Sequence, residues 1–155
     1  MYLWGYGVRK KLRLIINRLS IILIISIVLL SIPQQKFLYK TLKGEVPEDE
    51  YFIPIGKGDI KRSGNDVTVV ATGWMVSRAL EAADALAAEG IESEIVDPRT
   101  IKPLDKAIIL ESVKKTGRLV TLHEAPLTGG FGAEVSAIVC EEAFAHLKKP
   151  IMRIA

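Results

Sequence analysis

The segment HEAPLTGGFG, from His123 to Gly132, brings together the side chains of this sequence that are best suited to chemistry. An imidazole and a carboxylate can act as an acid–base pair, but His123 and Glu124 are adjacent, and neighbouring strand residues point to opposite faces. We therefore interpret His123 as a hydrogen-bonded structural residue. Gly129, Gly130 and Gly132 precede a predicted helix, where backbone amides can hold an anion. Because their spacing is not G-x-G-x-x-G, we favour a sharp turn and close packing of that helix on a sheet.

No stretch of the sequence has the spacing of a metal site, a nucleophile elbow or a Walker loop. Asp97 and Arg99 lie close enough in sequence to form a local ion pair that shapes the loop around them. Cys140 is the only cysteine, which excludes an internal disulfide, and its helical pattern predicts a buried, small apolar side chain. The residues by themselves therefore assign no catalytic, cofactor-binding or metal site.

Strands and helices alternate along the second part of the chain. Short β-branched runs predict strands, and apolar residues at spacings of three and four predict helices that glycines terminate. The predicted strands are 66–73, 93–97, 118–123 and 151–154, and the predicted helices are 75–89, 105–116 with Asp105 as its cap, and a third after Gly132. A run at 59–62 is predicted to pair with the first strand as a hairpin.

This alternation predicts an α/β fold of three layers: a mostly parallel sheet with one antiparallel edge strand, and helices on both faces. In such a sheet, the loops after the carboxyl ends of the strands meet ligands and partners. Three loops, 72–75, 97–100 and 123–132, therefore form the predicted functional edge.

The first 35 residues differ from the rest in composition. They carry five basic residues and no acidic one, so removing them from the total of 21 leaves 16 basic against 18 acidic residues. This balance argues against a nucleic-acid-binding face on the folded part, and no nucleic-acid partner is expected. Residues 14–32 form an apolar run of nineteen positions, nearly long enough for a membrane helix, so the alternatives are an anchor or a non-native start.

The chain thus divides into a basic and apolar segment with a predicted apolar helix at 1–35, an extended arm or linker at 36–56, and a folded domain at 57–155. Proline punctuation and the lack of a steady period characterise the arm. Membrane association through 14–32 is expected only if that segment is genuine.

Several segments, in this order, resemble one family: LYKTLKGEVPEDEYFIPIGKGDI, DVTVVATG, EIVDPRTIKPLD, SVKKTGRLV, HEAPLTGGFGAEV and EEAF. They are similar to the C-terminal, transketolase-C-like half of the beta subunit of the thiamine-diphosphate-dependent decarboxylating component of 2-oxo acid dehydrogenase complexes. The resemblance covers about Phe37 to Ala155. The HEAPLTGGF corner resembles the branched-chain (3-methyl-2-oxobutanoate) type more than the pyruvate type, and pyruvate and acetoin relatives stay open.

The resemblance implies oxidative decarboxylation of a 2-oxo acid on thiamine diphosphate by the assembled enzyme. In such subunits the glutamate that activates the cofactor and the active-site histidine belong to the N-terminal half, which residues 1–35 do not match. Relatives also continue beyond the IMRIA of 151–155. The chain is therefore expected to be a truncated subunit fragment that alone binds no cofactor and is inactive.

The resemblance also implies partners, namely a dehydrogenase alpha subunit, a second beta subunit and a lipoyl acyltransferase core, in the cytoplasm or the mitochondrial matrix. The candidate subunit-interface residues are His123, Glu124, Pro126, Gly129, Gly130, Phe131, Gly132, Asp97 and Arg99. An enzyme part of this kind is expected to expose an apolar patch where a partner domain sits. The alternatives are a membrane-tethered, non-catalytic interaction module and an anion-binding domain that uses the glycine amides.

Overall fold

The computed structural model describes residue 48 and residues 50–155, and Glu50–Ala155 form one compact unit. The apolar helix expected at 14–32, the rest of the 1–35 segment and most of the 36–56 arm lie outside the described residues. Within the described part, no helix combines the length and the apolar character needed to cross a bilayer. The compact unit thus starts seven residues before 57, the first residue of the expected domain.

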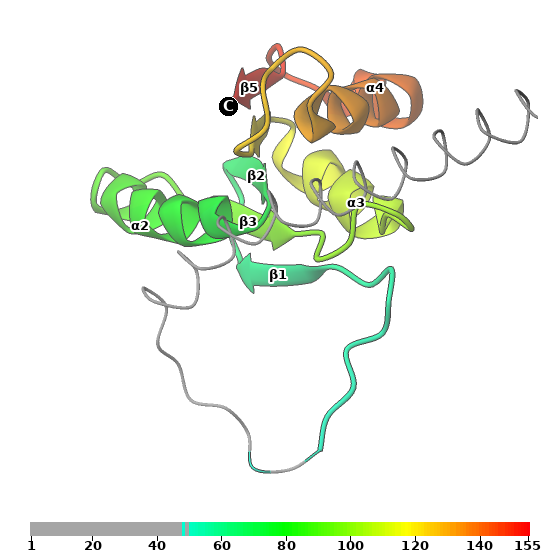
Figure 1. The fold of residues 1–155 in the computed structure, drawn as a ribbon. Helices are drawn as coiled ribbons and strands as arrows, with labels where there is room; N and C mark the ends of the chain where they lie inside the picture. The colour runs from blue at the N-terminus through cyan, green and yellow to red at the C-terminus, as the bar shows by residue number, and fades with distance from the viewer. Residues whose placement is uncertain (1–47, 49) are drawn as a thin grey trace, which may run out of the picture. The chain divides into compact units, whose positions relative to one another are not determined.

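The centre of the domain is a five-stranded sheet with the order β1-β3-β2-β4-β5 (Figure 1). Its strands are β1 Asp59–Arg62, β2 Val67–Ala71, β3 Ser93–Asp97, β4 Leu119–Leu122 and β5 Met152–Ile154. β2 pairs in parallel with β3 and β4, β4 pairs in parallel with β5, and β1 is antiparallel to β3 at one edge. The expected mostly parallel sheet with one antiparallel edge strand is confirmed.

The hairpin expected between 59–62 and 66–73 is wrong, because β3 lies between β1 and β2. The link from β1 to β2 crosses the amino end of β3 at Gly64, where an added Cβ would lie 2.3 Å from the carbonyl carbon of Ser93. A side chain cannot fit against backbone at this distance, so the crossing requires a glycine.

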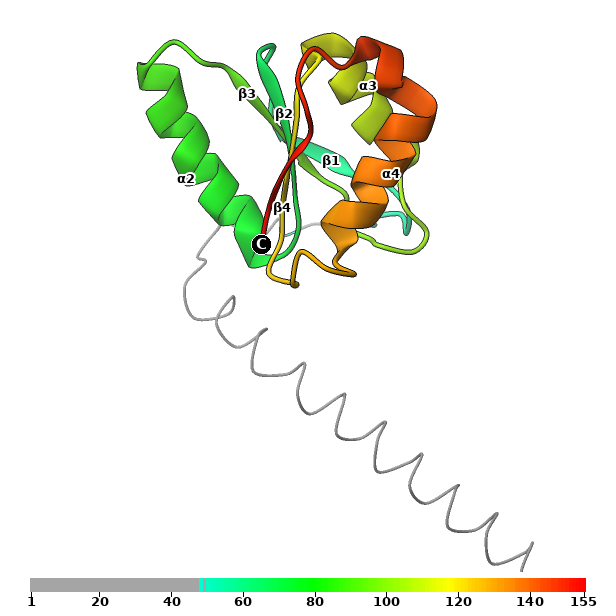
Figure 2. The same ribbon diagram turned by 90° about the horizontal axis from the view of Figure 1, so that it is seen from above.

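Helices cover both faces of the sheet (Figure 2). α2 (Trp74–Ala88) lies on one face, and α3 (Lys106–Thr116) and α4 (Phe131–Ala143) lie on the other. A 3-10 turn, η1 (Phe144–His146), follows α4. The three predicted layers are therefore present.

Each face of the sheet has its own core, because successive strand residues point to opposite sides. In β2, Val70 belongs to the core beneath α3 and α4, whereas Ala71 belongs to the smaller core beneath α2. β3 repeats the pattern with Val96 and Ile95, and all four side chains are buried. Helices therefore pack against both faces of β2 and β3, and this packing fixes the ends of the strands from which the loops start.

The side chains of Asp105 and Cys140 differ from what the sequence predicted for them. Asp105 occupies the cap position of α3, but its carboxylate makes no cap hydrogen bond and instead accepts one from the Gly58 amide at 3.1 Å. It thereby ties the segment before β1 to α3. The prediction that Cys140 is buried is wrong, because this residue is exposed on α4 while Ile138 and Val139 face the core.

Candidate functional site

His123 follows β4 directly and is almost completely buried, with 3% of its surface exposed. Its backbone amide donates a hydrogen bond to the Ile154 carbonyl at 3.2 Å, which extends the pairing of β4 with β5. The hydrogen bonds expected for its imidazole are not formed among the described residues, and the buried hydroxyl of Thr121 likewise lacks a partner there. The ring therefore fills space in the fold and is closed off from the surface.

The glycine corner after His123 closes on the imidazole. A Cβ on Gly130 would lie 2.7 Å from Cε1 of His123, and one on Gly132 would lie 2.5 Å from Nε2. Gly129 differs, because its φ is +72° and nothing lies within 4 Å of its Cβ position. Close approach at two glycines and a left-handed backbone at the third support the packing interpretation over anion binding.

The other residues of the corner divide between core and surface. Phe131 is half-buried and packs against the core beneath α3 and α4. Glu124 and Pro126 are exposed. Glu124 is exposed and His123 is buried, so the two side chains lie in different environments. Glu124 Oε2 lies 3.8 Å from the Cβ position of Gly73, so the corner lies beside the loop after β2.

The loop after β3 is held by Arg99, but the ion pair expected within it is not formed. The Asp97 carboxylate accepts a hydrogen bond from the Arg99 backbone amide at 2.9 Å, and the Arg99 guanidinium donates to Asp59 on β1 at 2.8 Å. Arg99 has a φ of +57°, a left-handed conformation that is uncommon for residues with a side chain. These contacts fix the loop to the edge strand.

The Asp59 carboxylate, on the edge strand β1, pairs with two cations, Lys61 and Arg99. A hydrogen bond from Lys61 lowers the pKa of Asp59 from its ordinary 3.8, and Arg99 lowers it further against the partial burial of the carboxyl. Asp59 is therefore ionised at neutral pH and accepts from both cations.

The predicted interface residues all lie near the carboxyl ends of β3 and β4, but they form two separate groups. Asp97 and Arg99 lie on the β1 and β3 side, whereas His123 and the glycines lie beyond β2, at the end of β4. Among the described residues, no hydrogen bond or ion pair joins the groups. The two groups therefore lie at the ends of different strands and do not form one catalytic site.

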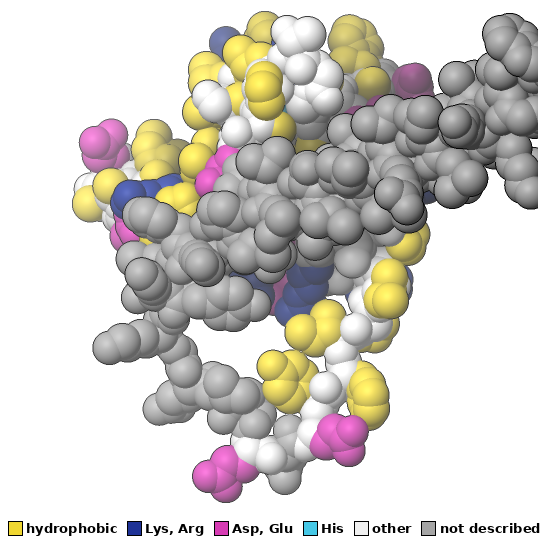
Figure 3. Space-filling view, in the orientation of Figure 1, with side chains coloured by type: hydrophobic (Ala, Val, Ile, Leu, Met, Phe, Trp, Pro, Cys, Tyr) yellow, Lys and Arg dark blue, Asp and Glu magenta, His cyan; other side chains and the backbone are white. Residues whose placement is uncertain are grey.

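Large apolar side chains are exposed around the same edge. Phe52 and Ile55, in the arm before β1, expose 84% and 81% of their surface, and Ile101, in the loop after β3, exposes 63%. Leu127, in the glycine corner, exposes 44%. Figure 3 shows the apolar side chains along the arm in yellow. These side chains are exposed one by one on three segments of the chain, and the apolar docking patch expected of a part of a larger assembly stays a prediction.

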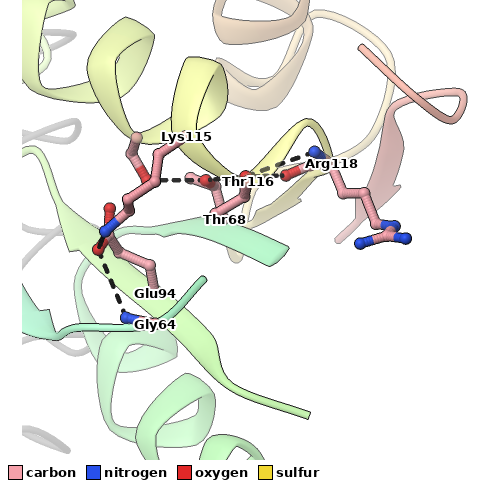
Figure 4. Close-up of polar contacts among 7 residues, drawn as sticks. Gly64, Thr68, Glu94, Lys115, Thr116 and Arg118 are labelled. Carbon is pink, nitrogen blue, oxygen red and sulfur yellow. Dashed lines mark hydrogen bonds and ion pairs between the residues drawn. The ribbon is translucent and has the colours of Figure 1, made fainter. Parts of the chain in front are cut away.

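A second polar group, which sequence reasoning missed, lies near the amino-terminal ends of β2 and β3 (Figure 4). Glu94 on β3 is 1% exposed, and its carboxylate pairs with Lys115 on α3 and accepts a hydrogen bond from the Gly64 amide at 3.4 Å. Burial raises the pKa of Glu94, but hydrogen bonds from Lys115 and Ser112 lower it more, so that it lies below the ordinary 4.5. The only signal in the sequence was a charged residue inside the otherwise strand-like SEIVD.

Buried hydroxyls continue this group toward the end of α3. The Thr68 hydroxyl lies 2.7 Å from that of Ser112 and 2.8 Å from that of Thr116. Thr116 in turn donates to the Arg118 carbonyl at 3.1 Å. Because each member has a partner, the group ties α3 to β2 and β3, which is a structural role.

The sheet order, the antiparallel edge strand and the helices on both faces define the class to which this domain belongs. The family model for the transketolase C-terminal domain matches residues 56–155, so the chain belongs to that family. Its relatives include beta subunits of 2-oxoisovalerate dehydrogenase, of pyruvate dehydrogenase and of an acetoin oxidoreductase.

The relatives include three types of enzyme subunit. The chain is 50% identical over 113 residues to the acetoin:2,6-dichlorophenolindophenol oxidoreductase subunit beta of Bacillus subtilis, covering 73% of this chain and 33% of that protein. It is 44% identical over 122 residues to the 2-oxoisovalerate dehydrogenase subunit beta of the same organism, covering 79% and 37%. It is 44% identical over 118 residues to a pyruvate dehydrogenase E1 component subunit beta of Staphylococcus epidermidis, covering 76% and 36%. The chain thus spans about a third of the length of these relatives.

Among solved structures, the chain resembles a split-gene transketolase described as an inactive beta4 tetramer. The TM-score is 0.62 at 37% sequence identity, over 72% of this chain and 36% of that one. The match supports the transketolase-C-like fold. Because the relatives are of three types, the comparisons do not decide which type of enzyme this chain belongs to.

Proposed function

We propose that this chain supplies the C-terminal part of a 2-oxo acid dehydrogenase beta subunit, and that its role is subunit assembly for the oxidative decarboxylation of a 2-oxo acid. The observation that carries the proposal is the exposed apolar surface of Phe52, Ile55 and Ile101 on a domain homologous to such subunits. Burying side chains of this size contributes about 1.5–3 kcal/mol each. Such a surface favours a partner that covers it.

The candidate interface residues take two roles in this proposal. His123, Gly130 and Gly132 are buried, so they set the shape of the corner without touching a partner. Glu124 and Pro126 are exposed there, next to Leu127. Gly129, Arg99 and half-buried Phe131 complete the row, and Asp97 fixes the backbone of Arg99. The partners are a dehydrogenase alpha subunit and a second beta subunit, with a lipoyl acyltransferase core beyond them, in the cytoplasm or the mitochondrial matrix.

Thiamine diphosphate belongs to the assembled enzyme in this proposal. A bound pyrophosphate needs a divalent cation held by carboxylates, or a cradle of open amides. Among the described residues, no three His, Cys, Asp or Glu side chains are placed to hold a metal ion. The amide-rich corner is closed on the imidazole of His123. The described residues therefore do not fit the cofactor, and we derive no step through it.

A chimera tests the assembly role. Residues 50–155 replace the matching region of the B. subtilis 2-oxoisovalerate dehydrogenase subunit beta, which is co-expressed with its alpha subunit and sized by light scattering. We expect assembly and decarboxylation, and loss of both when Phe52→Ser and Ile55→Ser are combined. Ile91→Ser is the matched control, because Ile91 is 37% exposed in the turn before β3, at the opposite edge. Full assembly of the double variant would refute the apolar surface as an interface.

The Gly130 and Phe131 corner has its own test in that chimera. Gly130→Ala together with Phe131→Ala distorts the corner, because a Cβ on Gly130 clashes with the Pro126 carbonyl oxygen and meets the ring of His123 at 2.7 Å. If assembly and activity survive both changes, the corner does not shape the interface.

We further propose the branched-chain type, on the HEAPLTGGF corner of 123–131. The 50% identity to an acetoin-type subunit supports the acetoin alternative, and pyruvate-type relatives match as well. The chain purified from its native source is separated by size, and the fraction that contains it is assayed with 2-oxoisovalerate, pyruvate and acetoin. The highest rate is expected with 2-oxoisovalerate, and a higher rate with either of the others would replace the type while leaving the assembly role intact.

A further inference from the structure

A pocket of about 500 Å³ opens between the end of α4, η1 and the start of β5. This volume lies within the range of small-molecule sites, roughly 300–1,000 Å³. Its apolar wall includes Phe144, Leu147 and Ile151. Leu147 and Ile151 pack against the core beneath α3 and α4, so their positions are fixed. Phe144 exposes 70% of its surface, so its ring is accessible to a ligand.

Three cationic side chains, Lys148, Lys149 and Arg153, line the same pocket, and no acidic side chain does. Lys148 Nζ donates to the Thr116 carbonyl at 3.3 Å, and Arg153 donates to the Leu127 carbonyl at 3.1 Å. Both acceptors are neutral, so they orient the cations without cancelling their charge.

The remaining charges near the pocket do not neutralise it. Within the part of the chain that the structure describes, Lys149 has no ion-pair or hydrogen-bond partner. The nearby acidic residues of α4, Glu141 and Glu142, are absent from the lining, and Glu142 pairs with Lys106 at 3.2 Å. The pocket thus combines an apolar wall with three uncompensated positive charges.

We propose that this pocket binds a small amphipathic anion, whose aliphatic or aromatic body lies on Phe144 and whose carboxylate or phosphate head lies among Lys148, Lys149 and Arg153. Charge complementarity fixes the sign of the ligand, because an anionic head gains from every cation and a cationic head is repelled. The apolar wall requires the body, since a bare anion would leave it in water. The site is built from α4, η1 and β5 and adjoins the carboxyl-edge surface at Arg153, whose guanidinium contacts the Leu127 carbonyl, but its test measures ligand binding and not assembly.

The chain has a built-in reporter of occupancy, because its only cysteine, Cys140, lines the pocket and is exposed. Iodoacetate and iodoacetamide alkylate the same thiolate, so the ratio of their rates reports the local charge and cancels the thiolate fraction. One cation about 6 Å away in water favours the anionic reagent about threefold at low salt. We expect the ratio, relative to N-acetylcysteine amide, to be raised at least threefold and to fall toward one in about 0.5 M salt.

Protection of Cys140 from iodoacetamide tests the ligand in the full chain. Decanoate and decyl phosphate, below their micellar concentrations, are expected to slow alkylation, whereas decyltrimethylammonium and inorganic phosphate are not. Comparing the first two identifies the preferred head group. Lys149→Gln and Arg153→Gln are each expected to weaken the protection about threefold. Lys102→Gln, at an exposed lysine outside the pocket lining, is the control.

Each other result overturns the proposal. Equal protection by the cationic detergent would show an apolar pocket without charge selection. Protection by inorganic phosphate alone would show an anion site without an apolar subsite. A rate ratio equal to that of the free thiol, with no protection by decanoate, would remove the site altogether. None of these readouts depends on decarboxylation, so failure here leaves the proposed assembly role untouched.

Discussion

The imidazole of His123 and the backbone of Gly132 are in contact across the corner that joins β4 to α4, where a Cβ on Gly132 would lie 2.5 Å from Nε2 of His123. Gly132→Ala must therefore push the buried ring or the start of α4. Overpacking of this kind costs about 1–3 kcal/mol. We expect that loss in the free energy of unfolding, measured with urea at neutral pH.

Gly129→Asn is the matched control for this prediction. Gly129 has a φ of +72° but nothing within 4 Å of its Cβ position, and asparagine tolerates left-handed backbone. Its loss should stay within about 1 kcal/mol. Equal losses at the two positions would mean that backbone conformation, and not contact with His123, explains the glycines of the corner.

The crossing at Gly64 should be one of the least tolerant glycine positions of the domain, because an added Cβ would meet backbone there. In Gly64→Ala the new Cβ would meet the Ser93 carbonyl carbon at 2.3 Å, and backbone cannot move aside as a side chain can. The expected loss is at or above the upper end of about 1–3 kcal/mol, seen as a lower urea midpoint. Gly90→Asn, with a φ of +82° and open space at its Cβ position, should be mild, and a mild Gly64→Ala would contradict the crossing.

Glu94 should make the stability of the domain depend on acid. Because its pKa in the folded state is lowered from 4.5, the ionised carboxylate stabilises the fold above that value, and this contribution is lost as the pH falls through the folded-state pKa. Glu94→Gln should thus be less stable than the wild type near pH 7 and lose less stability between about pH 6 and pH 3.

Urea unfolding across that range measures the effect. Glu111→Gln, which changes an exposed carboxylate on α3, is the control. Parallel pH curves for the wild type and Glu94→Gln would show that the pair with Lys115 adds no pH-dependent stability.

Arg99 separates backbone strain from its ion pair with Asp59. Both Arg99→Ala and Arg99→Gly remove the guanidinium, but only glycine relieves the φ of +57°. Arg99→Gly should be the more stable variant by about 1 kcal/mol in urea unfolding. If the two variants are equally stable, the left-handed conformation carries no cost in this loop.

The elements were predictable where their signals are local. The strand predicted at 93–97 has those bounds. Helix α3 starts directly after its predicted cap position, Asp105, and ends at the predicted Thr116, because β-branched runs, helical spacing and the left-handed Gly117 all act within a few residues. The partner of β1 was not predictable in this way, because pairing with β3 depends on contacts distant in sequence.

The polar contacts show the same division. Glu94 and Lys115 are 21 residues apart and meet only when α3 packs on the sheet, so no local sequence pattern predicts the pair. The glycines of 129–132 did indicate a tight corner, but the histidine they close on could be identified only from the folded backbone. Exposure of Cys140 was missed because a helical pattern locates the apolar stripe only to within a residue or so.

The position of β3 between two strands that are consecutive in the chain has a kinetic consequence. β1 and β2 cannot close as an early hairpin, so β1 stays without a strand partner until α2 has delivered β3 beside β2. Pairing β1 then requires closure of a long loop, which is a slow class of contact in folding. In refolding followed by pulsed hydrogen exchange, the amides of β2 and β4 should gain protection before those of β1.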